Sequence, residues 1–176
     1  MKPVAKRATP AAIAVLRQAT ALAPKRKKVS VGLLPSKAHI KANPNSDHNT
    51  GHAVDLTHDP HNGIDCSKIY EKLKEDKRVS YLIFSGRIWS KEYGDRAYEG
   101  KNKHVSHLHI SIRQEHDKDI SPWFPWLEKA KRTPKDVITV AKSKTSKPKK
   151  KTAKAATKNQ SLRKKSLFVS LFKRGK

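Results

Sequence analysis

Residues 105–113 read VSHLHISIR, and this stretch decides the kind of fold that the sequence predicts. Apolar and polar side chains alternate along it, which is the period of a β-strand with one buried face. The apolar face comprises Leu108, Ile110 and Ile112, and the polar face comprises His107, His109 and Ser111. We therefore expect a strand that is anchored in the core by one face and presents two imidazoles side by side on the other.

Other short elements lie on the N-terminal side of this strand. Residues 79–84, VSYLIF, predict a buried strand, and residues 88–90 predict its hairpin partner. Residues 52–57, HAVDLT, predict another strand, and residues 65–78 predict an amphipathic helix. Because strands and helices do not alternate regularly, we expect an α+β domain built on a small antiparallel sheet packed with helices.

Basic residues are concentrated at the two ends of the chain. The 176 residues include 40 Lys and Arg against 15 Asp and Glu, a net charge of +25. Residues 1–28 contribute +8 and residues 131–176 contribute +16, whereas residues 29–130 carry only +1. The net positive charge therefore lies almost entirely in the two ends, and we do not expect the central part to bind a specific nucleic acid.

These ends predict a three-part organisation. Residues 1–130 form the folded domain, including a core-packing helix over residues 10–23 that begins after Thr9. Residues 131–160 are rich in Lys, Ser, Thr and Ala and are expected to be a basic disordered linker. Residues 161–176 form a basic amphipathic segment, either a helix that lies on an anionic surface or a solvated tail.

The N-terminus does not predict a secretory signal peptide. Lys2 and Lys6 resemble a positively charged leader, but Arg17 and Gln18 interrupt the apolar run that must follow it. A single cysteine, Cys66, also excludes an intramolecular disulfide framework and any zinc site with several cysteines.

Residues 46–55, SDHNTGHAVD, supply metal-ligand side chains ahead of the His-x-His strand. Two histidines and one aspartate are a catalytic zinc set, because they leave a fourth coordination position open. Spacing alone does not choose the set, since His52, His58 or His61 can also be drawn into it.

Two motifs in order resemble a known group of metallopeptidases. The pattern Ser-x-His-x-x-Gly-x-Ala-x-Asp in residues 46–55 resembles the signature of zinc D-alanyl-D-alanine carboxypeptidases. The later His-x-His resembles the wider hedgehog/DD-peptidase fold group. Three stretches also resemble bacteriophage endolysin domains of this group. They are SDHNTGHAVDLTHDPHNGID, IFSGRIW and GKNKHVSHLHISI. The likeness covers about residues 10–113.

The resemblance assigns roles to individual residues. It implies that His48, Asp55 and His109 bind Zn²⁺ and that His107 is the catalytic base. It also implies that Ser46 orients the loop or contacts the substrate.

The sequence departs from the group at two positions. Some members carry a Glu three residues before the last ligand, where this chain has Ser106. Members also use an upstream Arg to bind the substrate carboxylate, whereas the nearby cations here are Lys37 and Lys41. Both carboxypeptidase and endopeptidase activity therefore stay open.

The resemblance implies a zinc-dependent peptidase that hydrolyses an amide bond in the peptide stem of bacterial peptidoglycan. As a phage endolysin, it would be a monomer that stays in the host bacterial cytoplasm until its release to the cell wall. Its basic ends would then bind anionic envelope polymers or a membrane surface. The alternative is a basic protein that binds polyanions or nucleic acid and has a degenerate or structural metal site.

Overall fold

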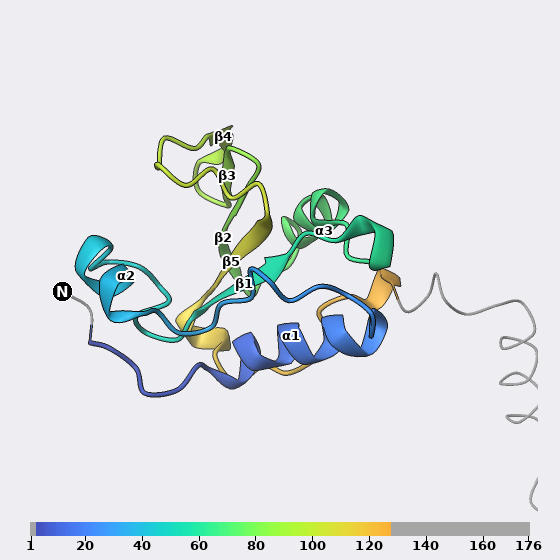
Figure 1. Ribbon diagram of the computed structural model, residues 1–176, viewed down its shortest axis with the longest axis horizontal. Helices are drawn as coiled ribbons and strands as arrows, with labels where there is room; N and C mark the ends of the chain where they lie inside the picture. Colours follow the sequence, from blue (N-terminus) through green and yellow to red (C-terminus); the bar gives the residue numbers. More distant parts are fainter. Residues whose placement is uncertain (1–2, 128–176) are drawn as a thin grey trace, which may run out of the picture. The chain divides into compact units, whose positions relative to one another are not determined.

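A five-stranded antiparallel sheet organises the part of the chain that the computed structural model describes, residues 3–127. The strands lie in the order β1-β5-β2-β3-β4 (Figure 1). They are β1 (Ala53–Thr57), β2 (Val79–Phe84), β3 (Arg87–Ser90), β4 (Gly94–Ala97) and β5 (His107–Ile112). The helices are α1 (Pro10–Leu22), α2 (Lys37–Ala42) and α3 (Cys66–Leu73), with 3-10 turns η1 (Pro60–Asn62) and η2 (Gln114–His116). The predicted α+β class is confirmed.

The two faces of the sheet have different surroundings. One face joins α1 and α3 in a single hydrophobic core. Its strand residues are Val54, Leu56, Val79, Leu82, Phe84, Leu108, Ile110 and Ile112. The opposite face of β5 carries His107, His109 and Ser111, as the alternation predicts. Because both large helices pack on the apolar face, the polar face is where a site can form.

Helix α1 begins where the sequence predicts, and most of the side chains that it buries are small. The Thr9 hydroxyl caps it by accepting a hydrogen bond from Ala12 N at 3.3 Å. Its buried residues are Ala11, Ala12, Ala14, Val15 and Ala19, whereas the larger Leu16 and Leu22 are only partly buried. Small side chains let the helix backbone lie close to the sheet.

One expected boundary is wrong, and one strand was not expected. The helix expected over residues 65–78 ends at Leu73, because Asp76 Oδ1 accepts a hydrogen bond from Arg78 N at 2.9 Å and so stabilises a turn in place of a further helical turn. Strand β4 was not expected, because its sequence GDRA has no apolar alternation and all four residues are exposed.

The expected linker over residues 131–160 and segment over residues 161–176 lie outside the described residues. Within residues 3–127, no helix has the length and apolar character needed to cross a bilayer.

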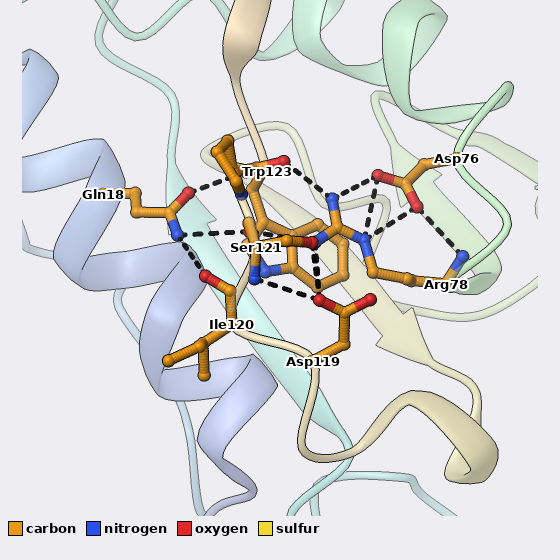
Figure 2. Close-up of polar contacts among 8 residues, drawn as sticks. Gln18, Asp76, Arg78, Asp119, Ile120, Ser121 and Trp123 are labelled. Carbon is orange, nitrogen blue, oxygen red and sulfur yellow. Dashed lines mark hydrogen bonds and ion pairs between the residues drawn. The ribbon is translucent and has the colours of Figure 1, made fainter.

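A buried arginine fastens the segment after η2 to the sheet. Figure 2 shows Arg78 between Asp76 and residues 119–123. Arg78 binds Asp76 through two nitrogens, Nε to Oδ1 at 2.9 Å and Nη2 to Oδ2 at 2.6 Å. It also donates to the carbonyl oxygens of Ser121 and Pro122, each at 3.0 Å, and its guanidinium lies 3.7 Å from the Trp123 ring centroid.

Helix α1 contacts the same segment through Gln18. Its Nε2 donates to the carbonyl oxygens of Ile120 and Ser121, and its Oε1 accepts from Trp123 N at 2.7 Å (Figure 2). The segment is therefore held from two directions, and Trp123 is fully buried in the core.

Replacing Arg78 with Ala should lower the free energy of unfolding by about 3 kcal/mol, because it removes the buried guanidinium that donates to the partly buried carboxylate of Asp76 and to two carbonyl groups. Urea denaturation measures the change. The control is Arg87→Ala, since Arg87 is also held in ion pairs, with Glu71 and Asp95, but its side chain is 50% exposed against 6% for Arg78. That variant should lose at most about 1 kcal/mol. Equal losses would contradict the structural role given to Arg78.

Candidate metal centre

Three side chains converge on the polar face of the sheet. Asp55 at the centre of β1 pairs with His109 on β5, so both side chains project from the same face. His48 joins them from the loop that precedes β1. Asp55 Oδ1 lies 3.0 Å from His109 Nδ1 and 3.2 Å from His48 Nε2. These are the three residues that the sequence analysis assigned to a metal.

The spacing of these atoms suits a small metal ion. One ligand atom from each residue lies within 4.8 Å of the other two. Ligands at about 2.0–2.2 Å from a tetrahedral zinc ion are about 3.4 Å apart, close to the separations measured around Asp55 Oδ1. Two imidazole nitrogens and a carboxylate oxygen are also donor types that zinc accepts. The cluster can therefore hold a metal ion.

The orientation of His48 gives a further reason to place a cation here. Its Nδ1 lies 3.3 Å from the carbonyl oxygen of Leu33, which can only accept, so Nδ1 carries a hydrogen. In a neutral ring Nε2 then presents a lone pair to the Asp55 carboxylate, and two acceptors 3.2 Å apart need a proton or a metal ion between them.

The titration behaviour of the cluster agrees with this arrangement. Burial opposes the charged form of His48, but the hydrogen bond to Asp55, the negative charge of Asp55 and the hydrogen bond to Leu33 together outweigh it and raise the pKa of His48. Burial likewise opposes ionisation of Asp55, yet hydrogen bonds from His109 and His48 hold its pKa well below the usual range. The cluster thus stabilises an ionised carboxylate that attracts a cation.

Asp55 is positioned by a glycine on a neighbouring segment. Gly32 forms a two-way backbone bridge with Asp55, in which Asp55 N donates to Gly32 O at 2.8 Å. A Cβ at position 32 would lie 2.8 Å from Asp55 Oδ2, which is too close for a real contact. Only glycine therefore leaves the carboxylate where it is.

His107 lies beside the cluster at the start of β5. Its Nε2 is 3.8 Å from Asp55 Oδ1, and its Nδ1 is 3.1 Å from the hydroxyl of Ser106. Ser106 in turn contacts the hydroxyl of Ser30 at 3.2 Å, which steadies the ring. Burial lowers the pKa of His107, so its imidazole is neutral near pH 7 and can accept a proton. Ser106 thus occupies the position where some members of the resembling group carry a Glu, and it contacts the expected base.

Ser46 orients the loop that precedes β1 and carries His48. Its hydroxyl accepts a hydrogen bond from His48 N at 3.3 Å and lies 3.1 Å from Nε2 of His39. This is the loop-orienting role expected for Ser46, while its contact with substrate stays a prediction.

The other candidate histidines lie apart from the cluster. Nδ1 of His52 lies 3.0 Å from the Thr50 hydroxyl, and Nδ1 of His58 accepts from Cys66 N at 3.1 Å at the start of α3. His61 lies exposed in η1. The alternative ligand sets that spacing allowed are therefore not brought together.

Sequence reasoning missed several residues at this site. Tyr81 stacks on His109 with ring centroids 5.4 Å apart, and His39 contacts His48 edge-on at 5.8 Å. His104 lies with its ring centroid 4.8 Å from that of His107. Burial lowers the pKa of His104 to about 4, so this ring is neutral as well. Tyr81 lies in a predicted strand and His104 in a quoted stretch, but nothing in the sequence assigned either of them, or His39, to the site, so only their contacts reveal them.

Comparison with known proteins adds a family. A family model described as the C-terminal domain of VldE matches residues 4–109, more than half of the chain, and the chain belongs to that family. The match extends from the segment before α1 to His109 and so includes all three candidate ligands. No curated protein and no solved structure matched significantly.

Replacing Gly32 with Ala should weaken metal binding about ten- to a hundredfold, because the new methyl group forces the Asp55 carboxylate out of place. Competition titration with a chromogenic chelator measures the affinity. The control is Gly63→Ala, whose φ of +93° makes the substitution strained while its Cβ would meet only Ala23. That variant should lose stability and keep its metal affinity. Unchanged affinity in the Gly32 variant would remove this residue from the site.

Proposed function

We propose that the protein is a zinc-dependent peptidase that hydrolyses an amide bond in the peptide stem of bacterial peptidoglycan, acting as a phage endolysin. The observation that carries the proposal is the convergence of His48, Asp55 and His109 with a fourth side chain, His107, beside them and not needed as a ligand. Three protein ligands and an open position are typical of catalytic zinc sites, whereas structural sites use four.

The residues supply the parts that amide hydrolysis needs. A bound zinc ion would polarise the scissile carbonyl and make a water molecule more acidic. His107 is neutral, is steadied through Ser106, and would accept the proton of the attacking water before passing it to the leaving amine. Since His₂Asp also accepts other divalent ions, zinc is proposed on ligand type and on the resemblance.

The substrate class rests on the two motifs in their order. Two stretches resemble those of zinc D-alanyl-D-alanine carboxypeptidases and of phage endolysin domains, and they read SDHNTGHAVDLTHDPHNGID and GKNKHVSHLHISI. In this chain they supply the loop, β1 and β5 that bring the cluster together. The resemblance and the geometry thus support the same four residues.

Substitutions should separate the ligands from the base. Replacing His48, Asp55 or His109 with Ala should remove both bound zinc and hydrolysis, since each supplies one ligand atom. Replacing His107 with Ala should leave zinc stoichiometry unchanged and lower the rate at least about a hundredfold. Zinc is measured by atomic spectroscopy, and cleavage by mass spectrometry of digested muropeptides, which also identifies the bond. Full hydrolysis by the His107 variant would contradict its role as the base.

A turbidity assay on purified sacculi distinguishes the peptidase from the alternative function. Loss of turbidity of purified sacculi, abolished by a chelator and restored by zinc, supports the peptidase. Intact sacculi together with tight binding to DNA that weakens steeply with salt would favour a polyanion-binding protein.

Deleting residues 131–176 should weaken binding to whole cells while sparing hydrolysis of soluble muropeptides, because it removes +16 of the +25 net charge. Cosedimentation with cells at several salt concentrations measures binding and its salt dependence. The parent chain serves as the reference at each salt concentration. Unchanged binding would show that the C-terminal region does not target the enzyme to the envelope.

A further inference from the structure

The loop over residues 98–106, which joins β4 to β5, is fastened to the tight turn between β2 and β3. Gly86 N donates to Lys103 O at 2.7 Å, and Ser85 N donates to His104 O at 3.2 Å. Tyr98 N donates to Gly86 O at 2.8 Å, so the loop is tied to the turn at both of its ends. The backbone around His104 is therefore held from outside the loop.

This fastening holds His104 in an unfavourable backbone conformation. Its φ is +52°, in the left-handed region that costs energy for any residue with a Cβ. Within residues 3–127, the other non-glycine residue with positive φ is Ser85, at +48° in the turn itself. Strained residues of this kind persist where the surroundings over-determine them, and they cluster at functional sites.

The conformation places the His104 ring among the histidines of the metal centre. Its centroid lies 4.8 Å from that of His107 and 5.7 Å from that of His109, and Tyr98 contacts its other side edge-on at 5.4 Å. It therefore adds a fifth side chain to the surroundings of the proposed reaction.

The hydrogen bonding of the His104 ring determines which of its nitrogens is a donor and which is an acceptor. Its Nδ1 lies 2.6 Å from the carbonyl oxygen of Asn102, which can only accept, so Nδ1 is the donor. The remaining nitrogen of the neutral ring, Nε2, is then an acceptor. No hydrogen bond within the described part of the chain engages Nε2.

We infer that His104 is a substrate-binding residue whose Nε2 accepts a hydrogen bond from a backbone N–H of the bound peptide and so holds the scissile amide against His107. This inference rests on the proposed function. A peptide offers one N–H per residue, and an acceptor of fixed orientation beside the base selects a peptide over an ester at that position. The strain at His104 fixes the orientation of the acceptor before the substrate arrives.

The positive φ allows a sharp variant. His104→Gly removes the imidazole while leaving a residue that adopts φ of +52° without strain. The matched control is Ser85→Gly, which makes the same backbone change at φ of +48° and removes no ring from the site. Both variants should keep stoichiometric zinc and a melting temperature within about 5 °C of the parent chain.

The two variants should differ in hydrolysis of soluble muropeptides. Ser85→Gly should keep kcat/KM within twofold, whereas His104→Gly should lose about 10- to 100-fold, the effect of removing one hydrogen bond at a desolvated site. A set of stem peptides in which single amide N–H groups are replaced by ester oxygens then supplies a double-mutant cycle. At one position the replacement should slow the parent enzyme by a similar factor and leave the His104→Gly variant unaffected.

Several outcomes would overturn the inference. Equal kcat/KM for the parent and His104→Gly would show that the ring does not contact the substrate. Loss of zinc or a large fall in melting temperature would show that it supports the metal site or the fold. If no ester replacement showed coupling to His104, the acceptor role would be wrong even where activity falls. A parent chain without chelator-sensitive hydrolysis would overturn the proposed function itself, which is a distinguishable result.

Discussion

The pairing of Asp55 with His109 across β1 and β5 is the constraint on which the site depends. It places a carboxylate oxygen and an imidazole nitrogen 3.0 Å apart on the polar face. The residues that flank them, such as Val54 and Leu108, enter the core from the opposite face. A shift of one residue in this register would turn apolar side chains to the site and ligands to the core. The hydrophobic core and the cluster therefore specify the same register.

The remaining parts of the site complete this pairing from other segments. His48 adds its Nε2 because its Nδ1 is held by the Leu33 carbonyl oxygen, and Gly32 leaves room for the Asp55 carboxylate. Helices α1 and α3 both join the core on the apolar face, the side of the sheet opposite the cluster. Arg78 holds the segment after η2 against that core without approaching the cluster.

The local pattern of apolar and polar residues predicted much of the sheet. It did not predict the elements in which this pattern is weak. Strand β5 alternates strictly and β2 is rich in apolar and aromatic residues, so both were predicted within two residues of their observed ends. Strand β4 is an exposed edge without alternation, and α3 ends early through a side-chain hydrogen bond of Asp76. Four of the five buried residues of α1 are alanines, which a search for large apolar residues does not find.

The sequence by itself determined the α+β class, the two faces of β5 and the restriction of the positive charge to the ends. Through motif resemblance it also predicted four site residues, which are His48, Asp55, His107 and His109. Only the tertiary structure decided that His48, Asp55 and His109 meet while His52, His58 and His61 do not. It also decided that Gly32 lies against the Asp55 carboxylate and that the His104 ring lies against His107. The physical reason is that ligand convergence depends on strand register and on backbone hydrogen bonds between distant segments, which no local pattern records.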